Sequence, residues 1–358
     1  MTDIRVRFEP LRDFITAVMH GLGLPAADAA TVGRLMAEAE LQGSDGHGVI
    51  RVLPYARRIR AGGINLNPHI KVVHERAAMA LLDGDNGMGH LVMERAAQLA
   101  VQKARTCGVG WVGARHSNHA GPASLYARMP LAHDMIGLYF AVGNANHLPP
   151  WGGLDMLLST NPIAVAVPAG VEPPVVLDMA TTVAAYGKVK AKAQRGEAMP
   201  IGWMIDRLGQ PLTDPKRAEE GFLLPIGGYK GYGLALVVGL LAGTLNGAAM
   251  GKDVIDFNHD DRSTTNTGQA VMAIDLSAFG DVAAFKARVD VLVRDLRAGE
   301  RMPGVERIWL PGEQSHERRA ANLRDGIPLT ARLHQQLQDF AREIGIAPLQ
   351  TISSQEAT

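Results

Sequence analysis

Residues 231–250 form an uncharged run, and no other stretch of the sequence constrains the fold as strongly. As a helix, such a run is long enough to cross a lipid bilayer. It contains five glycines and Asn246, however, lacks aromatic belts, and stands in a chain without basic-loop asymmetry. A helix that is apolar all round is also what the centre of a large protein requires. We therefore expect a buried core helix rather than a membrane span.

The rest of the composition is that of a water-soluble globular protein with two or three domains. Its 358 residues exceed what one hydrophobic core normally organises. Lysine plus arginine and aspartate plus glutamate both number 36, so nothing indicates a nucleic acid or an acidic membrane as partner. The single cysteine, Cys107, excludes an internal disulfide and a multi-cysteine zinc site. With an N-terminus that lacks a signal-peptide core, it predicts a cytoplasmic location.

Hydrophobic periodicity predicts helices at both ends of the chain and strands in its middle. Two helices are expected within 10–42, separated by a break at 21–25, and further helices at 91–106, 283–298 and 330–344. Expected strands cover 72–73, 78–82, 109–114, 135–142, 163–167, 175–177 and 268–274. The polar segment 189–221 is expected to be a loop that closes over something. Strict β-α-β alternation is absent, which favours an α+β fold.

The stretch 43–55 carries the clearest chemical signal. His47 lies between two glycines, so a ligand can approach its ring closely. Ser44 or Asp45 can cap a helix that begins near Gly48. We therefore expect a helix start directly after the histidine.

Such a helix would place His47, Arg51 and Tyr55 on one face, because they are spaced four residues apart. A proton carrier, a carboxylate-binding fork and a phenol would then share one space, which suits a small carboxylic acid. Pro54 could kink the helix and move Tyr55 off that face. The alternative is a capped surface helix with an ordinary histidine and arginine.

Several expected strands end in polar residues, which suggests one pocket assembled from many loops. His119 follows the strand at 109–114 and is a second candidate acid or base, with a structural histidine as the alternative. The other strands end in the segments 143–147, 159–162 and 178–182.

Two glycine-containing segments suit a cofactor. Gly227 to Gly233 opens the uncharged helix, and its free N–H groups and Lys230 suit a phosphate or the ribose–phosphate of a dinucleotide. The segment 310–313 is a tight turn that could close against a cofactor.

Three other motifs are discounted. Residues 108–113 match G-x-G-x-x-G, but a helix precedes them and the glycines lie in a strand, so we do not expect a Rossmann fold. The acidic loop 256–261 lacks the ligand spacing of a metal site. A serine hydrolase would need a G-x-S-x-G elbow, which is absent.

Taken together, the motifs resemble the type-2 malate/L-lactate dehydrogenase family. That family includes malate, L-sulfolactate and ureidoglycolate dehydrogenases, with diketogulonate and cyclic imino-acid reductases. The resemblance extends over almost the whole chain. It is carried by Gly-His-Gly-Val-Ile-Arg at 46–51, Ser-Asn-His at 117–119, Thr-Asn-Pro at 160–162, Asp-Met-Ala-Thr-Thr at 178–182, Tyr-Lys-Gly-Tyr-Gly at 229–233 and Leu-Pro-Gly-Glu at 310–313.

The resemblance implies a homodimer with a non-Rossmann, largely antiparallel nicotinamide-binding domain. Residues 1–75 and 310–358 would form a helical dimerisation domain that contributes to the substrate site. Residues 76–309 would bind the cofactor, with room for a small subdomain near 189–221.

The resemblance also implies roles for individual residues. His47 would give or take the proton, with His119 as the alternative, and Arg51 would hold the substrate carboxylate. Further substrate contacts would come from Tyr55, Asn146 and Thr160. The cofactor, NAD or alternatively NADP, would contact His119, Ala120, Gly121, Pro122, Ala123, Asp178, Met179, Ala180, Lys230, Pro311, Gly312 and Glu313.

Three positions depart from relatives of this family. Many members have serine at Gly46 and some have aspartate at Lys188, so a Ser–His–Asp relay cannot operate here. Ureidoglycolate-type members carry aspartate near Ala145, which makes that substrate a weaker candidate.

We predict an oxidoreductase that interconverts a small 2-hydroxy acid, malate-like or lactate-like, and its 2-oxo acid. The alternatives are an NADPH-dependent reductase of cyclic imino acids, a ureidoglycolate-type dehydrogenase and a non-catalytic module that binds small acids.

Overall fold

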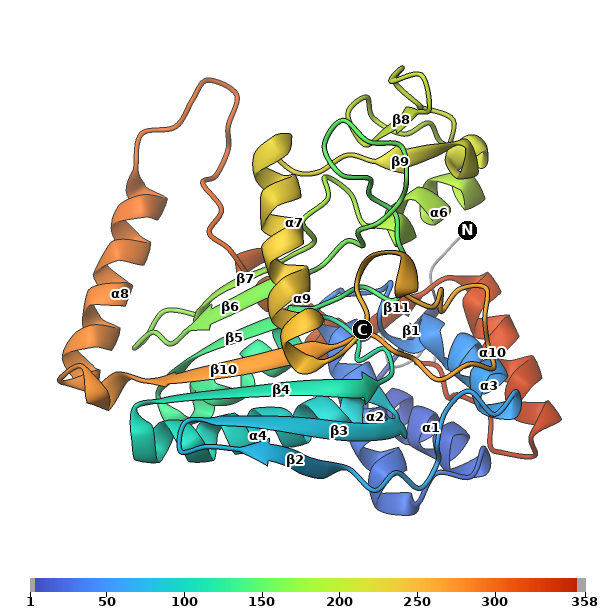
Figure 1. Ribbon diagram of the computed structural model, residues 1–358, viewed down its shortest axis with the longest axis horizontal. Coiled ribbons are helices and arrows are strands. Elements are labelled where there is room, and N and C mark those ends of the chain that lie inside the picture. Colours follow the sequence, from blue (N-terminus) through green and yellow to red (C-terminus); the bar gives the residue numbers. More distant parts are fainter. Residues whose placement is uncertain (1–3, 353–358) are drawn as a thin grey trace.

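A seven-stranded sheet forms the centre of the computed structural model, which describes residues 4–352 (Figure 1). All neighbouring strands run antiparallel except β3 and β4, which are parallel. The predicted α+β, largely antiparallel fold is confirmed. In spatial order the strands are β2 (Lys71–Glu75), β3 (Met79–Gly87), β4 (Val109–Ser117), β10 (Gln269–Asp275), β5 (Met135–Ala141), β6 (Ile163–Val167) and β7 (Val175–Met179).

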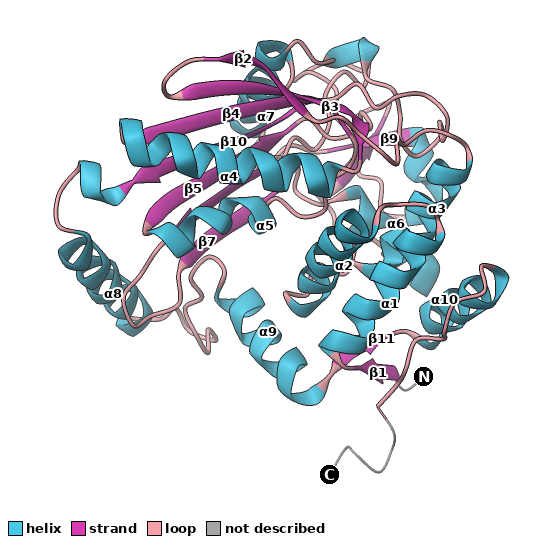
Figure 2. Cartoon of the chain, turned by 90° about the horizontal axis from the view of Figure 1, so that it is seen from below, coloured by secondary structure: helices cyan, strands magenta, loops and turns pink. Residues whose placement is uncertain are grey.

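One face of the sheet is covered by α4 (Gly89–Cys107) and α5 (Ser124–Ala127) (Figure 2). The helix packs directly on the strands, because a Cβ on Gly110 would lie 2.1 Å from the carbonyl oxygen of Ala100. Gly108 ends α4 in a left-handed conformation, with φ +76°. The glycines of the G-x-G-x-x-G match therefore serve helix termination and close packing.

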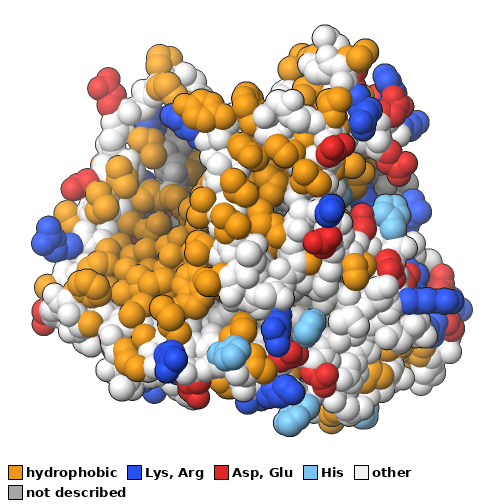
Figure 3. All heavy atoms as spheres, in the orientation of Figure 1, with side chains coloured by type: hydrophobic (Ala, Val, Ile, Leu, Met, Phe, Trp, Pro, Cys, Tyr) orange, Lys and Arg blue, Asp and Glu red, His pale blue; other side chains and the backbone are white. Residues whose placement is uncertain are grey.

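The opposite face is covered only in part. The helix α7 (Tyr229–Ala242) packs on Phe140 and Ala270, and α8 (Val282–Ala298) stands beside the ends of the strands, where its Asp290 accepts backbone N–H groups of 170–172. Between the two helices, apolar side chains of the sheet reach the surface (Figure 3).

The expected buried helix over 231–250 is wrong in extent and in burial. α7 ends at Ala242, and a short 3-10 turn follows at Thr244–Asn246. Val237 is 50% and Leu240 45% exposed, so only one side of the helix is covered. Within residues 4–352, no helix is long and apolar enough to cross a membrane.

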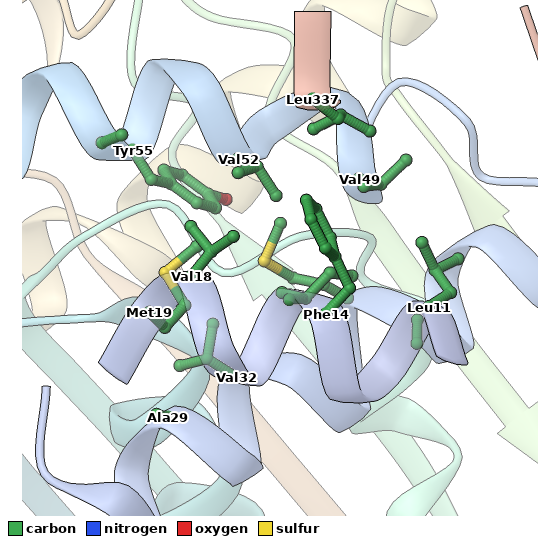
Figure 4. Close-up of a cluster of buried hydrophobic side chains, with 14 of the residues drawn as sticks. Leu11, Phe14, Val18, Met19, Ala29, Val32, Val49, Val52, Tyr55 and Leu337 are labelled. Atoms are coloured by element: carbon green, nitrogen blue, oxygen red, sulfur yellow. The ribbon is translucent and has the colours of Figure 1, made fainter. Parts of the chain in front are cut away.

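Helices from the two ends of the chain form a second core. They are α1 (Phe8–Gly21), α2 (Ala26–Leu41), α3 (Val52–Arg60) and α10 (Ala331–Glu343), with a small sheet of β1 (Ile4–Val6) and β11 (Ile327–Leu329). Val49, Val52 and Tyr55 point from the α3 side into this core, toward residues of α1 (Figure 4). The packing of these three side chains in the core holds the segment that carries His47 and Arg51 in place.

The segment expected to be a polar loop is more regular than predicted. It contains α6 (Tyr186–Arg195) and a hairpin of β8 (Met204–Asp206) and β9 (Gly221–Leu223). A small hydrophobic cluster of its own includes Val189, Met204 and Leu223. The remaining helix, α9 (Glu313–Asp325), leads from the turn at 310–313 to β11.

Candidate functional site

His47 lies in a turn between α2 and α3. The backbone N–H of His47 bonds to the carbonyl of Ser44 at 2.8 Å, and a 3-10 turn from Val49 to Arg51 leads into α3. Neither Ser44 nor Asp45 caps it, so the predicted cap is wrong. Pro54 falls in the first turn of α3, where its missing N–H costs nothing, and the helix continues.

A buried carboxyl from α2 does the capping instead. Glu40 is 3% exposed, and its Oε1 accepts the N–H of Val49 at 2.8 Å. Gly48 is needed here because a Cβ would lie 2.5 Å from Glu40 Cγ. Burial and the charge of Asp45 raise the pKa of Glu40 to about 8.

His47 and His119 are stacked side by side, although 72 residues separate them in the sequence. Their ring centroids are 5.2 Å apart with an interplanar angle of 15°. The hydroxyl of Tyr55, a fully buried residue of α3, lies 2.6 Å from His119 Nδ1. The structure thus brings together both histidines and the tyrosine that the sequence singled out.

The hydrogen bonds at His119 define its neutral tautomer. The N–H of Gly121 donates to His119 Nδ1 at 3.4 Å. Nδ1 is therefore the acceptor, so the Tyr55 hydroxyl donates to it as well. Neutral His119 then carries its hydrogen on Nε2 and is a hydrogen-bond donor from that atom.

Both histidines are held neutral near pH 7. Burial and the charge of Arg51 lower the pKa of His47 to about 4. Burial, Arg51, His47 and His90 lower the pKa of His119 as well. A neutral imidazole with a low pKa is ready to accept a proton when a nearby negative charge compensates Arg51.

Arg51 supplies the positive charge of this site. Its Nε donates to the carbonyl of Gly46 at 2.8 Å, which orients the guanidinium beside the turn. Among the described residues, no carboxylate forms an ion pair with it. Two guanidinium nitrogens in a fixed plane are suited to bind a ligand carboxylate.

An apolar wall closes the site from the loop 256–265. Phe257 lies 6.1 Å from the His119 ring and 6.4 Å from Tyr55. The loop is held by Arg58, 1% exposed, which stacks on Phe257 and donates to Asn118 Oδ1, Thr265 Oγ1 and two backbone carbonyls. Phe257 thereby covers one side of the His119 and Tyr55 rings.

Asn146 and Thr160, both predicted substrate contacts, lie in adjoining loops. The Oδ1 of Asn146 is buried without a hydrogen-bond partner among the described residues, while its Nδ2 donates to Gly251. Ser159, next to Thr160, donates to the carbonyl of Ala145. An unsatisfied amide oxygen is available for a ligand donor, and both roles stay predictions.

The proposed cofactor segments 119–124 and 311–312 both contact β7 (Val175–Met179), the first near its end and the second near its start. The N–H of Ser124 donates to Asp178 Oδ2 at 2.9 Å, which ties 119–124 to 178–180. The carbonyl of Pro311 accepts the N–H of Val176 at 3.0 Å. Gly312, at φ +90°, leaves no room for a Cβ against Val176.

Lys230 and Glu313 differ in their surroundings. Lys230 is exposed and lines a shallow pocket at the start of α7 with Gly227 and Gly231. Ile226 donates to the carbonyl of Thr181, so this pocket adjoins the segment after β7. The Glu313 carboxylate is buried and paired with Arg297 at 2.6 Å, so it holds its own turn together; direct cofactor contact stays a prediction.

Comparison with known proteins identifies the family. Residues 6–338 match the family model described as malate/L-lactate dehydrogenase. The chain belongs to the malate/L-lactate dehydrogenase family. A malate dehydrogenase of Pyrococcus abyssi is 37% identical to the chain over 97% of both proteins. The solved structure of malate dehydrogenase from Pyrococcus horikoshii OT3 superposes with a TM-score of 0.89, at 35% identity and 97% coverage of both chains.

A ureidoglycolate dehydrogenase (NAD(+)) of Escherichia coli K12 is 30% identical over 93% of the chain and 95% of that protein. The family assignment read from the motifs is thereby confirmed. It explains why the G-x-G-x-x-G match stands in a strand and not before a helix.

Some residues of the site carried no family motif and were missed. Phe257 reaches the site on the folded loop 256–265, which Arg58 of α3 holds in place, and the sequence analysis had only discounted 256–261 as a metal site. Glu40 had a weak signal, since it interrupts the apolar positions of an Ala-rich helix. His90 stands in an ordinary helix start and had none.

Proposed function

We propose that this member of the family interconverts a small 2-hydroxy acid, malate first among the candidates, and its 2-oxo acid with NAD. The observation that carries the proposal is the Arg51 guanidinium, which has no carboxylate partner among residues 4–352, beside the stacked His47 and His119. A cation and two neutral imidazoles are what a carboxylate with an adjacent hydroxyl requires. The higher identity to the malate dehydrogenase than to the ureidoglycolate dehydrogenase supports this choice.

Arg51 binds the substrate carboxylate in a two-pronged pair and fixes the adjacent carbon. Because the charge of Arg51 helps to lower the pKa of both histidines, a bound carboxylate offsets this effect. Burial still lowers the pKa of His47, but without the opposing charge of Arg51 this pKa rises and His47 becomes a better proton acceptor.

His47 and His119 have different roles at the substrate hydroxyl. His47 takes the hydroxyl proton in the oxidative direction and returns it in the reductive direction. His119 donates its Nε2–H to the same oxygen, because Tyr55 and Gly121 fix that tautomer. Phe257 keeps water away from the reacting carbon.

The residues around the end of β7 fit a nicotinamide dinucleotide. Asp178 offers an exposed carboxylate to ribose hydroxyls, and Lys230 with the N-terminus of α7 offers positive potential to phosphates. When bound, the nicotinamide supplies or accepts the hydride. The relative whose name specifies NAD+ supports NAD over the alternative, NADP.

A substrate panel tests the proposal. Malate, lactate, sulfolactate and their 2-oxo acids are assayed with both NAD(H) and NADP(H), beside ureidoglycolate and a cyclic imino acid. We expect turnover of a 2-hydroxy acid with NAD. Turnover of the imino acid with NADPH alone would overturn both the substrate and the cofactor. Cofactor binding without turnover of any compound would indicate a binding module.

We also propose a homodimer, supported by the uncovered sheet face. Trp111, Met272, Leu138, Val165 and Leu177 are successive cross-strand neighbours, and all are only half-buried. Figure 3 shows this apolar face open between α7 and α8. An exposed apolar patch of this kind is typical of a subunit interface.

Sedimentation tests the dimer. We expect a particle of twice 38.2 kDa. Val165 lies on the same face, paired with Leu138 and Leu177, so Val165→Glu is expected to shift the protein toward monomer. A wild-type protein that sediments as a monomer would refute the dimer without touching the proposed activity.

A further inference from the structure

His90 is a third histidine of the site and has no assigned role. It stands in the first turn of α4 and is fully buried. Its ring lies edge-on to Tyr55, at 5.8 Å between centroids and 81° between planes. A Cβ on Gly121 would lie 3.3 Å from His90 Nε2 and 3.9 Å from the backbone oxygen of His47, so both atoms border the space beside Gly121.

Neither ring nitrogen of His90 has a hydrogen-bond partner among the described residues. A neutral imidazole carries one donor and one acceptor, and burying both without partners costs several kcal/mol in typical cases. The Tyr55 hydroxyl cannot serve His90, because it donates to His119. His90 therefore needs a partner from elsewhere in the site.

A third buried ring nitrogen without a partner among the described residues belongs to His47. The Nδ1 of His47 is enclosed and makes no hydrogen bond within residues 4–352. His90 Nε2 and the backbone of His47 both border Gly121, and unsatisfied imidazole nitrogens in one enclosed region are suitable partners for a buried water, which needs two to four of them. No other assignment in the site uses these atoms.

We propose that His90 is a positioning residue that sets the tautomer of His47 through one bridging water. Nδ1–H of His47 donates to the water, and the water donates to a ring nitrogen of His90. Neutral His47 is then fixed with its hydrogen on Nδ1, and Nε2 keeps the lone pair that accepts the substrate proton. This inference rests on the proposed function of His47.

The surroundings support a neutral His90. Burial and the neighbouring His47 lower its pKa to about 3, so it stays an acceptor throughout the working range. The titratable groups that face His47 are Arg51 and Tyr55 on its own segment, His119 after β4 and His90 on α4. None of the others supplies an acceptor to Nδ1.

Nitrogen NMR of the full chain labelled at histidine tests the tautomer without any substrate. We expect neutral His47 in the Nδ1–H form at pH 7, and the loss of this preference in His90→Leu. Histidine in water favours the Nε2–H form, so a wild-type His47 found in that form would overturn the proposal. The NMR measurement does not depend on turnover. If no acid in the panel is turned over, the proposed function is refuted, whereas the tautomer of His47 is still tested.

Kinetics of two variants supply the second test. His90→Leu removes the acceptor and is expected to lower kcat roughly tenfold or more, to leave KM within about threefold, and to move the acid limb of the kcat profile to lower pH. His90→Gln keeps an acceptor and is expected to retain most of kcat. His74→Leu, on the exposed edge strand β2, is the control. A folded His90→Leu variant with unchanged kcat and pH profile would show that His90 only fills space, which would refute the proposal. If His90→Leu does not fold, the kcat of His90→Gln and the tautomer of His47 in the wild type test the proposal instead.

Discussion

Replacing Glu40 with glutamine tests the most unusual electrostatic feature of the site. The carboxyl is buried under the turn that leads from His47 to Arg51 and accepts the N–H of Val49 at 2.8 Å. Burial and Asp45 raise its pKa from 4.5 to about 8. Glutamine has nearly the same shape and can still accept that N–H, but it never ionises.

Proton linkage determines whether the free energy of unfolding rises or falls with pH. In the unfolded chain the carboxyl loses its proton near pH 4.5, whereas in the folded protein it keeps the proton until about pH 8. Between these values the folded state binds more protons, so the wild-type free energy of unfolding falls as the pH rises. The loss is small at pH 5 and complete above pH 8. At about 1.4 kcal/mol for each pKa unit, it amounts to at most about 5 kcal/mol.

Urea unfolding of the wild type and Glu40→Gln at pH 5 and pH 8.5, at one protein concentration, measures the effect. We expect near-equal stability at pH 5 and a variant more stable by a few kcal/mol at pH 8.5. Glu9→Gln, on the exposed side of α1, is the control and should show no such gain. A difference between wild type and Glu40→Gln that is the same at both pH values would refute the reasoning.

Three further outcomes test the site. Arg51→Lys should keep its fold and NADH affinity yet lose about 2–4 kcal/mol of transition-state binding in kcat/KM, because a single ammonium cannot pair twice with a carboxylate; near-normal kcat/KM would make Arg51 structural. His47→Asn should lower kcat roughly 100-fold with little change in cofactor binding; full loss in His119→Asn with activity kept in His47→Asn would transfer the role. Lys230→Ala should weaken NADH binding about tenfold, measured by fluorescence titration and diminishing with salt; equal affinity would leave Lys230 as a surface residue.

Local patterns were sufficient to predict most elements. The breaks at 21–25 and the alternating strands of the centre give periodic signals that do not depend on the rest of the fold, and α1, α2, β6 and α8 lie where they were expected. His47, Arg51, Tyr55 and His119 could be singled out as candidates because they carry recognisable chemistry in short motifs, and their roles stay predictions. The sequence predicted that these side chains share one space, but it could not give the distances between them.

Features that depend on distant contacts could not be predicted. The cap of the His47 turn comes from Glu40 and not from the adjacent Ser44 or Asp45. The reason is that α2, once folded, places the Glu40 carboxyl within hydrogen-bond distance of the Val49 N–H. The exposure of α7 could not be read from its composition either. An uncharged helix is equally compatible with a buried core and with a surface that a second subunit covers.

The stacked histidines explain why a carboxylate should be required and not merely preferred. At a centroid separation of 5.2 Å, two imidazolium charges would repel by about 3 kcal/mol at an effective dielectric constant of about 20, so the pair holds one proton at a time. Arg51 already places one positive charge beside them, and it disfavours even that proton. A bound carboxylate neutralises the charge of Arg51. Adding one proton to His47 then gives the site a net charge of one positive unit, the same as in the empty site. A simple alcohol would leave Arg51 uncompensated and the histidines neutral, so the acid group that positions the substrate also permits the proton transfer.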